Sequence, residues 1–344
     1  MENITHTLVA VALSRAGLNR KAAYATGALI VAANLPDIDI ATVLRSPLEY
    51  LRWERGYTHS VLGVTLLAAL LFPLFRLGEA IFRRGQPSRI RWLPFFAVCW
   101  AGTASHLLLD LLDSYGVRAG LPFSGRWLAA DLAFIWDPWI FGILLVALFV
   151  PWITKLVSEE IGARSKTPPG RASAILALGL VAVFCGVRAY GHARAVGLLD
   201  ARIYHGRTPL AVGAFPDALS PAVWHGVVET AGTYELIEVN VLLPERFDPD
   251  RASTHYKPTA SPALDAAENT HTARMFLESA RFPLANVEHL ADGWRVRIRD
   301  LRFASATRRR RSFVVTIGLD EEFHVRDESF RVGGSAEPPL PREP

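Results

Sequence analysis

The sequence predicts an α-helical membrane domain followed by a soluble α+β domain that is rich in sheet. Long uncharged runs of Leu, Ala, Val and Phe fill roughly the first 190 residues, and four of these runs approach the length of a bilayer span. Apolar and polar residues alternate after residue 189. The hydrophobic fraction of 51% and the mean hydropathy of +0.21 therefore average two unlike halves. We place the membrane domain at residues 1–188, the soluble domain at 189–335 and a flexible tail at 336–344.

Four spans are predicted at residues 60–77, 93–112, 139–157 and 172–187. Each approaches the roughly 20 residues that cross a bilayer core, although the last one is slightly short. Two shorter apolar stretches at 7–18 and 22–35 precede the spans and are joined by the basic turn RAGLNRK. We expect these two stretches to form a helical hairpin that packs against the spans or inserts partly.

Basic residues gather in the loops on one side of the predicted spans. Two loops carry most of them, at Arg83, Arg84, Arg89 and Arg91 and at Lys155, Arg164, Lys166 and Arg171. Short loops rich in Lys and Arg stay in the cytoplasm. The basic loop at 45–55 argues against this orientation, but it also holds Glu49 and Glu54. We therefore expect an integral membrane protein whose C-terminal domain lies outside the cytoplasm.

Histidine and aspartate are segregated within the membrane half. Its three histidines and six aspartates all lie at or just beyond the segment ends that are predicted to face away from the cytoplasm. These nine residues are His6, Asp37, Asp39, His59, His106, Asp110, Asp113, Asp131 and Asp137. Scattered solvating charges would not segregate in this way, so the pattern indicates one site built from several helix ends.

The segment ASHLLLDLLDSYG, residues 104–116, places three of these side chains on one helical face. His106 and Asp110 are one turn apart, and Asp113 is one turn further along. A histidine and a carboxylate at this spacing can hold one divalent ion. Ionisable residues near membrane depth are costly and usually functional, which favours a metal site. A polar seam between helices is the alternative.

Two further groups of residues supply matching ligands. NLPDID, residues 34–39, presents Asp37 and Asp39 on an extended or turning backbone where a proline ends a helix. His6 and His59 each begin an apolar helix. Nitrogen and oxygen ligands without thiolate suit Zn²⁺, Mn²⁺ or Fe, and we expect one or two divalent ions, with Zn²⁺ favoured.

Each of these residues also has a purely structural interpretation. A histidine at a helix start is commonly a cap or a hydrogen-bonded packing residue, and Asp37 and Asp39 suit a turn and an N-cap. Asp131 and Asp137 suit helix caps or a pair with Arg126. The membrane depth of His106 and Asp110, and the shared location of all nine residues, favour the metal site over these local explanations.

Five pieces of the sequence together resemble the membrane-bound, metal-dependent hydrolases, also described as LexA-binding, inner-membrane-associated hydrolases. The pieces are NITH, NLPDID, RGYTHS, SHLLLDLLDSYG and LPFSGRWLAADLAFIWDPW, in order over residues 3–140. The resemblance implies a bacterial inner-membrane hydrolase whose metal ligands are His6, Asp37, Asp39, His59, His106 and Asp110. It places Asp113, Asp131 and Asp137 in or near the site. A more distant similarity to zinc-dependent phospholipase C favours phosphoester substrates.

The sequence therefore predicts a metal-dependent hydrolase at the non-cytoplasmic interface, with membrane lipids around it and a phosphoester or lipid-derived substrate. Metal-activated water would react, and Asp113 or Asp137 would be the catalytic base. Aromatic residues near the site are typical of headgroup depth; they are Trp127, Trp136 and Trp139. A non-catalytic regulator or scaffold with a partner-binding soluble domain is the alternative. A transporter is disfavoured because no inverted repeat is visible.

The C-terminal half predicts an antiparallel sheet with one amphipathic helix. Alternating stretches at 234–243, 294–303, 312–320 and 323–332 indicate half-buried strands, and residues 261–280 indicate the helix. The modest net charge of +4 does not indicate a nucleic-acid partner. The run Arg308–Arg311 suits a solvated hairpin tip better than contact with anionic headgroups or nucleic acid.

Overall fold

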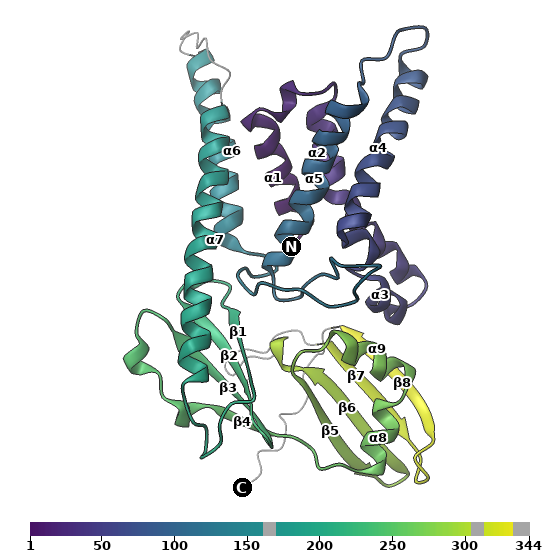
Figure 1. Cartoon of the computed structure of the whole chain (residues 1–344), viewed down its shortest axis with the longest axis vertical. Coiled ribbons are helices and arrows are strands. Elements are labelled where there is room, and N and C mark those ends of the chain that lie inside the picture. Colours follow the sequence, from purple (N-terminus) through teal and green to yellow (C-terminus); the bar gives the residue numbers. More distant parts are fainter. Residues whose placement is uncertain (161–169, 304–312, 333–344) are drawn as a thin grey trace. The chain divides into compact units, whose positions relative to one another are not determined.

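The computed structural model describes residues 1–160, 170–303 and 313–332 (Figure 1). The chain divides into two compact units. The first comprises Met1–Ala41 and Trp53–Ala189, and the second comprises Thr42–Arg52 and the chain from Tyr190. The predicted tail at 336–344 and the run Arg308–Arg311 lie outside the described residues.

The first unit is helical. Its α-helices and 3-10 helices are α1 (Asn3–Ala16), η1 (Leu18–Arg20), α2 (Ala25–Asn34), η2 (Leu35–Leu44), η3 (Tyr57–His59), α4 (Val61–Phe82), α5 (Trp92–Leu112), α6 (Pro138–Glu160) and the first part of α7 (Arg171–Asp200). Four apolar helical runs are long enough to cross a membrane, namely Ala25–Leu44, Val61–Phe82, Trp92–Leu112 and Arg171–Asp200; Pro138–Thr154 is a shorter apolar helix. This confirms the predicted helical membrane domain.

Two details differ from the sequence prediction. Helices α1 and α2 form the expected hairpin, since Ser14 bonds to Thr26 and Asn34 to Thr7, but its second arm is longer than predicted because α2 runs directly into η2 and the two together reach span length. The NLPDID segment is not extended. The α-helix ends at Asn34 as predicted, but the backbone tightens into a 3-10 helix instead of opening into a turn.

Helices α2 and α5 approach each other closely at Gly102. A Cβ atom added at Gly102 would lie 2.7 Å from Ala32 Cβ and 3.0 Å from the Leu29 carbonyl oxygen. The facing residues of α2 are small or fully buried, and they share a core with Phe95 and Val98 of α5. The missing side chain at 102 therefore fixes the spacing of two helices that carry site residues at their ends.

A long loop joins α5 to α6 and is held in place by hydrogen bonds. Val117 and Leu128 pair as an isolated antiparallel bridge. Arg188, buried in α7, donates from Nε to the Leu132 carbonyl oxygen at 2.8 Å. The Asp137 carboxylate accepts hydrogen bonds from backbone amides at the start of α6. The loop is thus anchored to both neighbouring helices.

The second unit contains two four-stranded antiparallel sheets (Figure 1). The first, in the order β1-β2-β3-β4, consists of β1 (Ala211–Pro216), β2 (Val223–Glu229), β3 (Thr233–Asn240) and β4 (Ser253–Tyr256). The second, in the order β5-β6-β7-β8, consists of β5 (Pro283–Leu290), β6 (Gly293–Asp300), β7 (Phe313–Leu319) and β8 (Val325–Val332). Three more α-helices belong largely to this unit, α3 (Pro47–Trp53), α8 (Pro262–Glu268) and α9 (His271–Ser279), as do η4 (Pro244–Arg246), η5 (Pro249–Arg251) and η6 (Leu301–Phe303).

Helices α8 and α9 cover one face of the second sheet. Val296 and Ile298 of β6 pair in register with Ile317 and Val315 of β7, and all four are buried against α8 and α9. The alternation of apolar and polar residues therefore corresponds to a half-buried sheet, as predicted. The single helix expected at 261–280 is two helices, because Thr270 caps a new helix by accepting a hydrogen bond from the Ala273 amide.

Candidate metal centre

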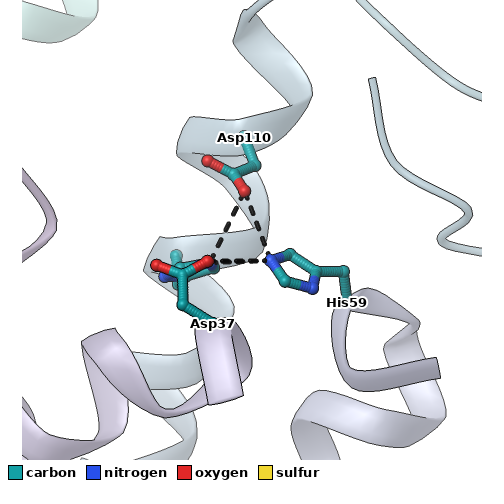
Figure 2. Close-up of side chains that lie close together, drawn as sticks. Asp37, His59 and Asp110 are labelled. Carbon is teal, nitrogen blue, oxygen red and sulfur yellow. Dashed lines mark hydrogen bonds and ion pairs between the residues drawn. The ribbon is translucent and has the colours of Figure 1, made fainter. Parts of the chain in front are cut away.

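Four side chains each bring one ligand atom to a common centre. The atoms are Asp37 Oδ1, His59 Nε2, His106 Nε2 and Asp110 Oδ2, and all lie within 4.8 Å of one another. The two imidazole nitrogens are 3.0 Å apart. Each nitrogen lies 3.4–3.5 Å from both carboxylate oxygens. Figure 2 shows Asp37, His59 and Asp110 converging from separate segments of the chain.

The local fold explains how these segments present their ligands. His106 and Asp110 lie one turn apart in α5, as the sequence spacing predicts. Asp37 follows the end of α2 in the first turn of η2. His59 ends η3, and α4 begins directly after it because Ser60 Oγ accepts a hydrogen bond from the Gly63 amide at 2.9 Å.

Acceptors behind both imidazole rings aim their Nε2 atoms at the centre. His106 Nδ1–H donates to the Ala33 carbonyl oxygen at 2.7 Å, which leaves the Nε2 lone pair facing the cluster. His59 Nδ1 lies 3.2 Å from Asp39 Oδ2 and 3.0 Å from Thr58 Oγ1. A carbonyl or carboxylate in this position is the usual second contact of a metal-bound histidine, because it fixes the tautomer and the ring orientation.

The two Nε2 atoms lie 3.0 Å apart, which is hydrogen-bond distance, so without metal one proton lies between them. Burial opposes the charged form of His59, but hydrogen bonds to carboxylates outweigh burial and raise its pKa to about 10; the carboxylates are Asp110, Asp37 and Asp39. Without metal, this centre holds a proton at neutral pH. A divalent ion would displace that proton, since metal ligands bind in their deprotonated form.

The spacing of the ligand atoms fits a tetrahedral divalent ion. Zinc bonds of about 2.0–2.1 Å place neighbouring tetrahedral ligands about 3.3–3.4 Å apart. The observed separations from the two imidazole nitrogens are 3.0–3.5 Å. Asp37 Oδ2 and Asp110 Oδ2 are buried and accept no hydrogen bond from the described residues. Asp110 Oδ2 lies 3.4–3.5 Å from His59 Nε2, His106 Nε2 and Arg55 Nε, whereas Asp37 Oδ2 is left with room for a further partner.

The other two predicted ligands contact this centre from outside the four-atom group. Asp39 stands behind His59. His6 stacks on His106 with ring centroids 3.8 Å apart, and its Nε2 lies 3.2 Å from Asp110 Oδ1. The structure therefore brings all six predicted ligand residues together, four with atoms at the centre and two in direct contact with those four.

Asp113, expected as a catalytic base, forms an ion pair with Arg55. Both Asp113 oxygens lie 2.8 Å from Arg55 Nη1, and Oδ1 also accepts the Tyr115 amide hydrogen at 2.9 Å. Arg55 Nε lies 3.5 Å from Asp110 Oδ2. Burial opposes the charge on Arg55, but the Asp113 and Asp110 carboxylates outweigh it and raise the pKa of the guanidinium. The N-terminal ammonium of Met1 contacts the same two carboxylates.

Asp131 and Asp137 lie in the loop before α6 and do not belong to the four-atom centre. Asp137 Oδ1 accepts hydrogen bonds from the Trp139 and Ile140 amides at 3.0 and 3.1 Å. Its contacts are those of a helix cap, which is the structural interpretation that the sequence offered. Asp131 is buried and has a left-handed backbone conformation, with φ of 56°.

Sequence reasoning missed Arg55, although it lies inside the quoted RGYTHS segment. Arg55 lies in the turn before η3 and follows no periodic pattern, so its place within this segment was the only signal that could have indicated it. Another group with metal-ligand spacing occurs among the described residues at Asp320, Glu322 and His324, on the connection between β7 and β8. This second group is largely solvent-exposed, unlike the first.

Apolar spans and a buried His/Asp cluster at helix ends define an integral membrane protein with a candidate metal centre. Residues 1–195 match the family described as YdjM inner membrane protein, and the chain belongs to that family. Residues 262–332 match the YfhP C-terminal alpha/beta plait domain, which agrees with the second sheet and its two helices.

One relative is the uncharacterized protein YfhP of Bacillus subtilis (strain 168). It is 28% identical to this chain over 123 residues, which is 36% of this chain. The match covers 35% of YfhP, so about one third of that relative's length is represented. No solved structure matches the chain.

Proposed function

We propose that this chain is a membrane-embedded, metal-dependent hydrolase that binds one divalent ion, preferably Zn²⁺, at Asp37, His59, His106 and Asp110. The observation that carries the proposal is the pair of Nε2 atoms 3.0 Å apart, with two carboxylate oxygens 3.4–3.5 Å from each. The resemblance of five sequence pieces to metal-dependent hydrolases supports the same activity.

A divalent ion at this centre would lower the pKa of a water molecule and polarise a phosphoryl or carbonyl oxygen. The residues of the chain would hold the ion and orient the water and the substrate. Asp37 is the one ligand whose side chain is partly exposed, at 25%, whereas those of His59 and Asp110 are 0–1% exposed. We therefore assign the approach of water and substrate to the Asp37 side.

Proton transfer in this proposal belongs to Asp37, because the two carboxylates expected from sequence are occupied. Asp113 is paired with Arg55, and Asp137 binds backbone amides. Asp37 Oδ2 accepts no hydrogen bond from the described residues and belongs to the ligand whose side chain is partly exposed. A carboxylate in hydrogen-bond reach of the reacting water is the first requirement for a general base.

The surroundings of Asp37 favour a lipid-derived phosphoester. Ile38 and Ile40 alternate with the two aspartates of η2 and are 56% and 60% exposed. Trp136 and Trp139 are also exposed near the start of α6, and exposed Trp is typical of headgroup depth. Exposed apolar residues next to Asp37 in η2 suit a substrate with an acyl chain. The distribution of basic loops supports a non-cytoplasmic position for the site.

The experiment is hydrolysis of chromogenic phosphodiesters, phosphomonoesters and carboxylic esters by Zn²⁺-loaded protein in mixed lipid–detergent micelles. Wild type is expected to hydrolyse a phosphoester, and His106→Ala is expected to lose at least about 100-fold in rate, since metal stabilisation is worth several kcal/mol. His289→Ala is the control, because this exposed imidazole lies on the second sheet. Metal-bound wild type without activity on any of these substrates would favour the scaffold alternative.

Asp39→Asn distinguishes a residue that orients a ligand from a ligand itself. Asp39 contacts His59 Nδ1 and not the four-atom centre, so its loss should weaken metal binding and leave the site intact. Loss of such a contact typically costs about 10–100-fold in metal affinity. Competition with a fluorescent zinc chelator measures the affinity, and we expect saturation to stay at one ion per chain. Unchanged metal affinity would show that Asp39 does not orient His59 for metal binding.

A further inference from the structure

Arg55 introduces a permanent positive charge beside the metal centre. Its guanidinium is buried and faces two carboxylates of α5 and the loop that follows, Asp110 and Asp113. Nη1 lies 2.8 Å from both Asp113 oxygens, and Nε lies 3.5 Å from the Asp110 oxygen that belongs to the centre. Arginine is not deprotonated in proteins, so this charge does not depend on pH.

The backbone at Arg55 is built to hold this side chain in place. Arg55 has φ of 49°, a left-handed conformation that is uncommon for residues other than glycine. Its backbone amide donates to Asp39 Oδ2 at 2.9 Å, and its guanidinium lies 4.8 Å from the centroid of the Tyr115 ring. A side chain fixed by its backbone, two carboxylates and an aromatic ring has one position, and that position adjoins the centre.

This position is the one that a second metal ion would need. Ions of a dinuclear hydrolase site lie about 3.5–4 Å apart and share a carboxylate. Asp110 is the carboxylate that extends beyond the first centre, since its Oδ1 lies 3.2 Å from His6 Nε2. Asp113 is the next carboxylate on the same face, and both of its oxygens are held by Arg55.

We propose that Arg55 takes the place of a second metal ion and keeps the centre mononuclear. The inference rests on the proposed metal centre and adds the number of ions and the residue that sets it. A guanidinium between Asp110 and Asp113 neutralises part of their charge and repels a second divalent cation. Removing the guanidinium would leave the buried Asp110 and Asp113 carboxylates with His6 and the N-terminal amino group of Met1, which must lose its proton when it binds metal. These oxygen and nitrogen ligands suit another divalent ion.

The test is the zinc content of full-length protein after equilibrium dialysis against micromolar free Zn²⁺. We compare wild type, Arg55→Gln, Arg55→Lys and the control Arg52→Gln, which removes an exposed arginine three residues earlier, 55% exposed. Wild type, Arg55→Lys and Arg52→Gln should each bind one zinc per chain, because a side-chain cation stays beside Asp113 in addition to the N-terminal ammonium of Met1. Arg55→Gln should bind two. Circular dichroism and gel filtration establish that each variant is folded.

The outcomes separate this inference from the proposed function. Two zinc ions in the wild type would overturn the role of Arg55 and leave the metal centre standing, and this result needs no variant to fold. One zinc in folded Arg55→Gln would also overturn it. No zinc in wild type would refute the metal centre itself and the inference with it.

Discussion

Asp110→Asn is expected to abolish retention of the divalent ion in purified protein. Asp110 supplies one of the four ligand atoms through Oδ2 and contacts His6 through Oδ1. The substitution removes a negative charge from a fully buried position and leaves Arg55 facing one carboxylate instead of two. Breaking a buried ion pair typically costs about 3–5 kcal/mol, so the free energy of unfolding should fall as well. Elemental analysis and thermal unfolding measure the two effects.

The matched control is Asp292→Asn, the same change at an exposed residue in the turn between β5 and β6, 74% exposed. It should leave both metal content and stability within error of wild type. The loss in Asp110→Asn must exceed the loss in Asp39→Asn, because a ligand atom is removed in one case and an orienting contact in the other. Full metal retention by Asp110→Asn would show that Asp110 is not a ligand.

Gly102→Leu is expected to destabilise the membrane unit strongly and to disorganise the centre. A Cβ at this position would already lie 2.7 Å from Ala32 Cβ, and the rest of a leucine side chain would force α2 and α5 apart. Overpacking a tight core costs about 1–3 kcal/mol and occasionally more; we expect the upper end because the backbones themselves are in contact. Asp37 follows α2 and His106 lies on α5, so their separation should also lower metal content.

Gly142→Leu in α6 controls for the change of residue. A Cβ at Gly142 meets no atom within 4 Å, so the larger side chain has room there. Replacing a helical glycine also raises helix propensity by up to about 1 kcal/mol. The two substitutions should therefore act in opposite directions in a thermal-stability assay. Equal stability of Gly102→Leu and wild type would mean that α2 and α5 are farther apart than the structure shows.

Most of the fold was predictable because apolar runs and alternation carry strong physical signals. Helices α4, α5 and α7 were predicted from long apolar runs, which are stable only inside a membrane or a protein core. Strand β2 was not predicted, because most of its residues are buried and VWHGVVE shows no alternation of apolar and polar residues. Strand β4 is only four residues long. The α2–η2 run is longer than the sequence predicts, because the chain continues through Pro36 as a 3-10 helix.

The part of the site that lies within one helix or one motif could be predicted from the sequence. His106 and Asp110 share a face of α5, and that spacing alone brings their side chains together. Two aspartates two residues apart do not reveal which one binds metal, and only the fold places Asp37 at the centre and Asp39 behind His59. The contact of His106 with the Ala33 carbonyl joins two helices and leaves no trace in local sequence.

The central claim is that separate segments of the membrane unit chelate one divalent ion, and X-ray absorption at the metal edge tests it most directly. Wild-type protein purified without chelators should contain zinc or a similar ion. Its spectrum should show a four-coordinate site with two imidazole nitrogens and two carboxylate oxygens at about 2.0–2.2 Å. Protein that contains no metal after reconstitution with Zn²⁺, or bound metal without imidazole scattering, would contradict the account.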